Sequence, residues 1–252
     1  MKNYSIAEEY TLPSGGKVYP QNVNPVVKLR SMTTEEEMKR LSPSERGYKN
    51  LCEIIDDCLV EDPGISAYDM CLADYQFLLH KLRIVTYGSD YHCSSLCPYC
   101  KSENENVVDM SQLDVVNYNH EDLSKYMEFE LPVTKRNIKI RLQTPRMIDD
   151  INLRNKEIRK KSRGTAGESS FLFTLASLVD TVDGNKLDPV KKEDFVRNLP
   201  MMDTNYIMKH AEKLVESFGV QTILHNSCPV CGLDYDTSFR VTKEFFGPRI
   251  DI

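Results

Sequence analysis

The sequence predicts an α+β fold in which amphipathic helices are combined with short antiparallel β-hairpins and a zinc-ribbon-like site of four cysteines. Three observations predict it. Apolar residues recur at helical spacing in several segments. Other segments alternate apolar and charged residues, as strands do. The phrase C-P-x-C occurs twice, at residues 97–100 and 228–231, and the 127 residues numbered 101–227 separate the two copies.

Composition limits the class of protein. A chain of 252 residues can bury a core without disulfides, so its eight cysteines need another explanation. The polar beginning MKNYSIAEEY lacks a signal-peptide pattern and no stretch is apolar enough for a transmembrane helix, so we expect an intracellular protein. Closely spaced cysteines in a reducing compartment are typical of metal or redox sites. The 38 acidic residues outnumber the 32 basic ones, which disfavours a protein that coats nucleic acid.

Changes in composition divide the chain into three parts. Pro, Gly and Asn are frequent near the N-terminus, and the stretch RNKEIRKKSRGTAGESS resembles a helix end that leads into a linker. We therefore expect an extended arm or hairpin at residues 1–31, a helical region with the first zinc knuckle and β-hairpins at 32–162, and a helical region with the second knuckle, packed on the preceding region, at 163–252.

Caps and apolar spacing predict three helices before the first cysteine pair. Thr33 and Glu36 form a capping box at the start of the first helix. A second helix starts near Ser44, and a third starts at Ser66 and ends at Gly88. Strand-like pieces lie before these helices at residues 17–19 and 26–29.

The centre of the chain predicts a hairpin, because YMEFELP and NIKIRLQTP alternate apolar and charged residues. In an antiparallel arrangement Glu128 and Glu130 oppose Lys139 and Arg141 on one face. The segment VVDMSQLDVVNY suggests two further short strands around a turn.

The C-terminal part predicts three helices and a β-like segment. SSFLFTLASLV is an apolar helix, GNKLDPVKKEDFVRNL contains a loop and a short helix, and a third helix is capped by Asp203 and ended by Gly219. The segment LDYDTSFRVTKEFF, after the second cysteine pair, has the composition of a strand. Both cysteine pairs thus follow a helix by a few residues and precede a β-like segment.

Each C-P-x-C phrase supplies two thiolates from one tight turn, which is half of a tetrahedral site. The two halves together complete a structural Zn²⁺ site without an open position for water. Gly232, directly after the second pair, permits a left-handed residue there. Such a site would clamp residues 88–116 onto residues 220–246. The expected ligands are Cys97, Cys100, Cys228 and Cys231.

Other interpretations of the cysteines stay open. A thioredoxin-like redox pair is one, although neither pair is followed by an amphipathic helix. Reduced cysteines in unrelated turns are another. His92 or Cys93 could replace a ligand of the first pair. The three cysteines in the helical segments are expected to be small buried hydrophobes: Cys52, Cys58 and Cys71.

We find no motif that specifies a reaction: no nucleophile elbow, P-loop, dinucleotide turn or H-E-x-x-H. The acidic pairs at residues 56–57 and 149–150 read as solvated faces or caps. The basic run at residues 154–163 could contact phosphate, but a solvated helix end or an acidic protein partner is favoured.

The order of several segments resembles a known family. LPSGGKVY, VVKLRSMTTEEEMKRL and YQFLLHKLRIVTYG precede CPYC and VVDMSQLDVV, and the chain ends with the aromatic segment RVTKEFFGPR. This order is similar to the baseplate hub and tail-assembly proteins of contractile-tailed phages, the T-even-type baseplate family.

The resemblance implies a non-enzymatic late protein of virion morphogenesis. It would be made in the host cytoplasm and would contact other phage tail or baseplate proteins, as a hub subunit that stays in the virion or as a transient assembly chaperone. The resemblance implies no catalytic residues and no small-molecule substrate. It leaves open whether the protein forms a homo-oligomer. The alternative is a zinc-ribbon protein that binds nucleic acid or is associated with transcription.

Overall fold

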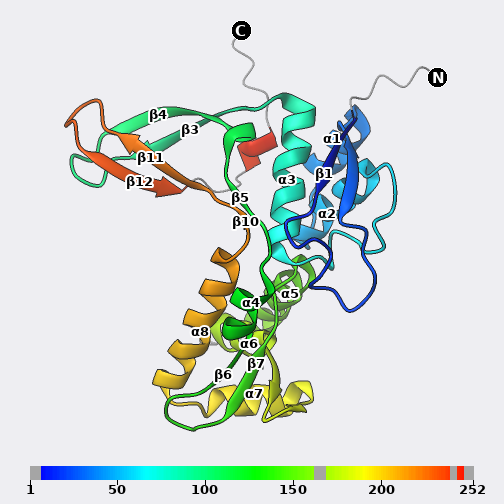
Figure 1. Ribbon diagram of the computed structural model, residues 1–252, viewed down its shortest axis with the longest axis vertical. Helices are drawn as coiled ribbons and strands as arrows, with labels where there is room; N and C mark the ends of the chain where they lie inside the picture. The colour runs from blue at the N-terminus through cyan, green and yellow to red at the C-terminus, as the bar shows by residue number, and fades with distance from the viewer. Residues whose placement is uncertain (1–6, 162–168, 239–242, 247–252) are drawn as a thin grey trace.

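The computed structural model describes residues 7–161, 169–238 and 243–246, which form two helical bodies and a projecting arm (Figure 1). Each body has its own cluster of buried apolar side chains. The arm consists of two hairpins from distant parts of the chain and extends to one side of the first body. The sheets are short and antiparallel, so the predicted α+β class is confirmed.

The first body packs helices against a two-stranded hairpin. The predicted capping box is present, since the Thr33 amide donates to the Glu36 carboxylate at 2.7 Å. The third helix starts at Leu72 rather than at Ser66, because residues 66–70 form a separate turn. The strand expected at residues 26–29 is present, whereas residues 17–19 form a turn. The elements are β1 (Ala7–Thr11), β2 (Val26–Arg30), α1 (Thr34–Leu41), α2 (Gly47–Cys58) and α3 (Leu72–Tyr87).

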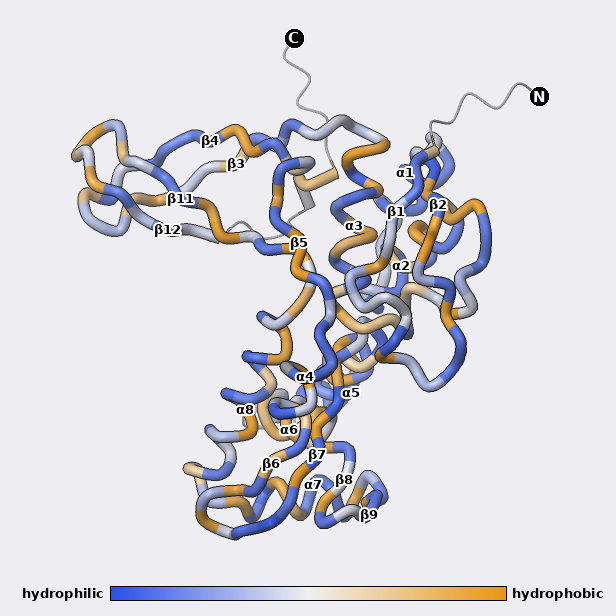
Figure 2. Tube along the Cα trace, viewed as in Figure 1, coloured by the Kyte–Doolittle hydropathy of each residue, from blue (hydrophilic) through white to orange (hydrophobic). Residues whose placement is uncertain are grey.

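The second body surrounds a four-stranded antiparallel sheet, β6-β7-β8-β9, with helices. Along both bodies, apolar and polar residues alternate within the elements, as Figure 2 shows. The sheet buries Ile138 and Ile140 on its inner face. The elements are α4 (His120–Met127), β6 (Glu128–Glu130), β7 (Asn137–Ile140), α5 (Pro145–Lys161), α6 (Ser170–Leu178), β8 (Val179–Val182), β9 (Asn185–Lys186), α7 (Pro189–Arg197) and α8 (Met201–Glu216).

The predicted central hairpin is present, with one difference in register. Glu128 lies opposite Lys139, as predicted. Glu130 lies opposite Asn137 and not opposite Arg141, because an antiparallel pairing of Glu128 with Lys139 places residue 137 opposite residue 130. Strand β7 ends at Ile140, and the next residue turns toward α6. There the guanidinium of Arg141 donates to the carbonyl oxygen of Ser177 at 2.7 Å.

The arm joins the rest of the chain through a short two-stranded pair, β5 (Val115–Val116) with β10 (Gly219–Val220). The two strands predicted in VVDMSQLDVVNY do flank a turn, η1 (Met110–Gln112), but each pairs with a different partner. Among the helices of the described ranges, none combines the length and apolar character that crossing a bilayer requires. The arm strands are β3 (Asp90–Leu96), β4 (Glu103–Asp109), β11 (Ile223–Ser227) and β12 (Asp234–Ser238).

A buried carboxylate connects the two bodies. Asp149, on α5, is 2% exposed and accepts hydrogen bonds from the amides of Tyr48 (3.2 Å) and Lys49 (2.9 Å). These amides are in the first turn of α2 and have no partner within that helix. Tyr68 donates its hydroxyl to the same carboxylate at 3.2 Å. Asp149 is therefore an N-terminal cap that one body supplies to a helix of the other.

Asp203 does not cap its own helix, contrary to the sequence-based expectation. Helix α8 already begins at Met201, and the buried Asp203 carboxylate accepts from the amides of Val133 (2.8 Å) and Thr134 (3.0 Å). The first turn of α8 thus fixes the tight turn between β6 and β7.

Asp74, in the first turn of α3, has a comparable role in the first body. Its fully buried carboxylate accepts from the Ser14 amide (3.0 Å), the Ser14 hydroxyl (2.5 Å) and the Tyr19 hydroxyl (2.6 Å). Burial raises the pKa of Asp74, and these donors oppose the rise. The loop that follows β1 is held on α3 by this group.

The predicted linker and the aromatic tail are partly described. The stretch from Arg154 to Lys161 is the end of α5, and residues 162–168 lie outside the described residues. In the tail, residues 239–242 also lie outside them, and η2 (Lys243–Phe246) follows as a 3₁₀ turn rather than a strand. Phe245 is fully buried against the first body, where its ring lies 5.3 Å from those of His80 and Tyr91.

Candidate metal centre

Each C-P-x-C pair lies in the turn of a hairpin at the far end of the arm. The β3–β4 pairing ends with Leu96 opposite Glu103, and the first pair lies between them. The β11–β12 pairing ends with Ser227 opposite Asp234 around the second pair. A helix precedes each pair in the chain, as expected, but the few residues between the helix and the cysteines include a strand that was not predicted. Two hairpins place the knuckles side by side (Figure 1).

The two knuckles have the same backbone hydrogen bonds. The Lys101 amide donates to the Cys97 carbonyl oxygen at 3.0 Å, and the Gly232 amide donates to that of Cys228 at 2.8 Å. Both donor residues are left-handed, with φ of 61° and 71°. The prediction for Gly232 is confirmed, and a lysine takes the equivalent position in the first knuckle.

The four sulfur atoms lie close enough together to hold one metal ion. Cys97 Sγ lies 3.8 Å from Cys231 Sγ, and Cys100 Sγ lies 3.6 Å from Cys228 Sγ. All four sulfurs lie within 4.8 Å of one another. Ligands at about 2.3 Å from a tetrahedral ion are about 3.8 Å apart, so one ion fits between these atoms. Each hairpin contributes half of the ligands.

A polar network beneath the sulfurs joins the two hairpins. The Tyr235 hydroxyl, on β12, lies 2.8 Å from Ser95 Oγ on β3, and Asn104 Nδ2 on β4 donates to it at 2.9 Å. Asn104 also donates toward Cys228 Sγ at 3.7 Å. Sequence reasoning missed these three side chains, because each is an ordinary strand residue. The only signal for them is their spacing, since Ser95 lies two residues before Cys97, and Asn104 and Tyr235 each lie four residues after the last cysteine of their knuckle.

The thiols differ in their readiness to ionise. The Ser102 hydroxyl, 3.3 Å from Cys228 Sγ, and neighbouring backbone amides lower the pKa of Cys228 to about 5. Ser102 also lowers the pKa of Cys100. The Leu233 amide favours the thiolate of Cys231, but burial and the adjacent thiols outweigh it and raise that pKa to about 12. Four thiolates this close repel one another, and a divalent cation removes that obstacle.

The remaining cysteines lie elsewhere. Cys52, Cys58 and Cys71 are buried, as expected, and burial raises the pKa of Cys58 and Cys71 to about 12. Cys93 is on β3, where it packs against the first body's cluster. Within the described residues, neither Cys93 nor His92 belongs to the group of metal-competent side chains. The thioredoxin-like interpretation loses support, because neither C-P-x-C pair opens a helix.

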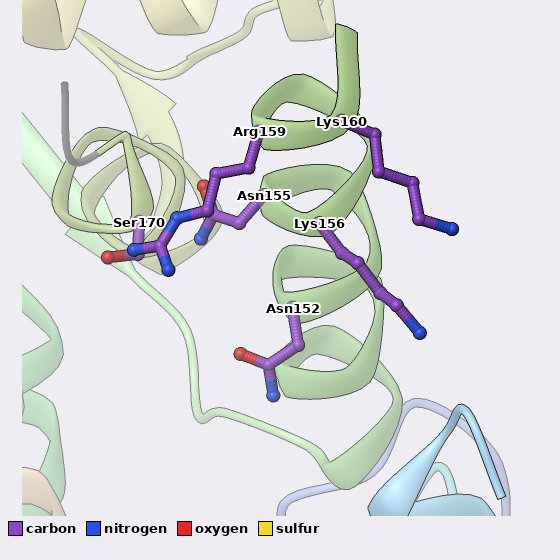
Figure 3. Close-up of a pocket in the computed structure, with 6 residues that line it drawn as sticks. All are labelled: Asn152, Asn155, Lys156, Arg159, Lys160 and Ser170. Carbon is purple, nitrogen blue, oxygen red and sulfur yellow. The ribbon is translucent and has the colours of Figure 1, made fainter. Parts of the chain in front are cut away.

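The basic run forms part of α5 and lines a shallow polar recess of about 660 Å³ (Figure 3). Arg159 extends toward Ser170, whereas Lys156 and Lys160 point away from it. Arg154 forms an ion pair with Glu193, and Lys156 forms one with Glu45 at 2.9 Å. The acidic partners of these two residues are therefore in the same chain, and the residues that line the recess include no acidic or nucleophilic group besides Ser170.

Comparison with known proteins identifies one family. The family model described as T4 bacteriophage base plate protein matches residues 3–247, which is nearly the whole chain. No match was found among curated proteins or among solved structures.

Proposed function

The chain belongs to the T4 bacteriophage base plate protein family, and from this premise we propose that it is a non-enzymatic component or assembly factor of the baseplate hub. The family match over residues 3–247 is the observation that carries the proposal. The protein works by contacts with other phage tail or baseplate proteins. It is made in the host cytoplasm, and it remains in the virion if it is a hub component.

A scaffold role agrees with how the buried charges are used. Asp74, Asp149 and Asp203 are each buried, and each accepts hydrogen bonds from backbone amides of another segment. Such carboxylates hold segments together, and their oxygens are occupied by donors of the same chain. These contacts support a protein whose task is to present a fixed shape.

The arm is held by a structural zinc ion in this proposal. Its ligands are the four cysteines of the two knuckles, which fill every position of a tetrahedral ion and leave none for water. The ion supplies cross-linking and charge compensation, while Ser102 and Asn104 orient the sulfur of Cys228. The two hairpins then behave as one unit.

Metal analysis tests the zinc. One equivalent of zinc per chain is expected in the purified protein, and Cys228→Ser should lose it. Cys58→Ser, a change of a buried cysteine outside the group, is the matched control and should keep the metal. Protein that refolds fully without metal, or that keeps zinc after Cys228→Ser, would contradict this part of the proposal.

Phage genetics tests the role in the hub. Cells infected with a phage that lacks this gene should accumulate baseplates without complete hubs, and the gene supplied in trans should restore them. Mass spectrometry of purified virions separates the two variants of the proposal, because a hub component remains in the particle and an assembly factor does not. Normal baseplates without the gene would overturn it.

A further inference from the structure

The far end of the arm exposes apolar side chains. We call Leu96, Tyr99, Val230 and Leu233 the arm tip. Tyr99 and Val230 occupy equivalent positions, since each is the third residue of its knuckle, and they are 60% and 71% exposed. Leu96 and Leu233 flank the knuckles and are also exposed. In Figure 2 the end of the arm that is farthest from both bodies alternates between hydrophobic and hydrophilic stretches.

Metal binding does not require this exposure. Of the residues inside each knuckle, the cysteines supply the ligands and the proline fixes the turn, whereas the third residue is exposed and supplies no ligand. The cluster that the cysteines form with Tyr235 is complete without the tip. Exposed apolar groups gathered at one place mark interaction sites.

The arm is strongly acidic around the tip. Residues 89–109 contain four acidic side chains against one lysine, and residues 223–238 contain two acidic side chains and neither Lys nor Arg. Most of the chain's net charge of −6 therefore falls on the arm. Glu103, Glu105 and Asp234 are exposed beside the knuckles. Four thiolates around one divalent cation add further negative charge.

From this combination, we propose that the arm tip is a docking surface for another baseplate protein, one that presents an apolar centre rimmed by Lys and Arg. The acidic surroundings attract such a surface and repel nucleic acid. The zinc ion and the Tyr235 network hold the tip rigid before contact, which lowers the entropic cost of binding. This inference rests on the proposed function, because it names the chemistry of a partner within the baseplate.

Site-specific cross-linking tests the inference directly. p-Benzoylphenylalanine replaces Tyr99 in the full chain, which is expressed in infected cells and irradiated. Replacement of Val60, an exposed apolar residue of the first body, is the matched control. We expect the Tyr99 probe, and not the Val60 probe, to cross-link to a phage baseplate protein at a patch with apolar and basic residues. A cross-link to nucleic acid, to a second copy of this chain, or to nothing would overturn the inference.

A variant separates this inference from the proposed function. Tyr99→Ser combined with Val230→Ser should keep one zinc per chain, which shows that the arm is folded, and should lower the yield of infectious particles by about tenfold or more. Val60→Ser should leave the yield unchanged. If loss of the gene abolishes hubs but the double variant has normal yield, the docking inference fails alone. If loss of the gene has no effect, the proposed function fails.

Discussion

Lys101 and Gly232 take the same left-handed backbone position, each one residue after the last cysteine of its knuckle, and each donates its amide to the carbonyl oxygen of the first cysteine. The left-handed conformation costs conformational free energy at Lys101 and almost none at Gly232, because a residue with a side chain is strained there and glycine is not. The effects of a lysine and of a glycine at this backbone position can therefore be compared within one protein.

The second knuckle should weaken when its glycine is replaced. Gly232→Ala has free space for the methyl group, so its effect is confined to the backbone. We expect a cost of about 1 to 2 kcal/mol, or roughly five- to thirtyfold weaker zinc binding in a chelator competition. Lys101→Gly should change the affinity in the opposite direction. Gly47→Ala, at a helix start with equal space, is the control and should not alter zinc binding.

The cap that joins the bodies should be sensitive to truncation. Asp149→Ala leaves two amides of the first turn of α2 and the Tyr68 hydroxyl without their acceptor, and we expect a loss of about 2 to 3 kcal/mol in the free energy of unfolding, measured with urea. Asp150→Ala removes only a surface pair with Arg46, and should cost less than about 1 kcal/mol. Equal losses in the two variants would contradict the assigned role.

Glu36 should make the protein sensitive to acid. Burial alone would raise its pKa, but Arg30 and the donors of Thr33 outweigh burial and lower the pKa to about 2. Because the folded value lies below the ordinary value near 4.5, this group's contribution to stability is present above pH 4.5 and is lost as the pH falls toward 2. Unfolding free energies measured across this window should fall less steeply in Glu36→Gln. Glu35→Gln, an exposed neighbour, should retain the wild-type slope.

Metal removal should loosen the arm and leave the bodies folded. The cluster of cysteines and Tyr235 is separate from the two large clusters, so each body keeps its own core. After chelation, we expect hydrogen exchange to accelerate at least tenfold in the paired strands of the arm and to remain slow in α3 and α6. Loss of protection in α3 at the same chelator concentration would show that the ion supports the whole fold.

Local rules account for much of what was predicted. The capping box of Thr33 and Glu36, the alternation in the central hairpin and the left-handed turn at Gly232 each depend on residues a few positions apart. The proximity of the four cysteines could be predicted because one chemical requirement, a complete tetrahedral set of ligands, connects two short patterns wherever they occur in the chain.

Other features depend on packing between distant segments. Asp149 reads as a surface or cap residue of its own helix, yet it caps α2, about a hundred positions earlier in the chain. Asp203 bonds to a turn that comes 70 residues before it. The partners of β4 and β5 could not be predicted for the same reason. These two strands are neighbours in sequence, but β4 pairs with β3 and β5 pairs with β10. The β-propensity of a segment does not indicate which distant segment it will pair with.

The distance in sequence between the two knuckles also has a consequence in time. The ribosome makes Cys97 and Cys100 while Cys228 and Cys231 do not yet exist, and the second body is made in between. A chain cut short at any point in that interval has half of the ligands and lacks Tyr235. The finished arm therefore occurs only on molecules whose synthesis has passed the second body, and a protein that binds the arm selects such chains from shorter fragments.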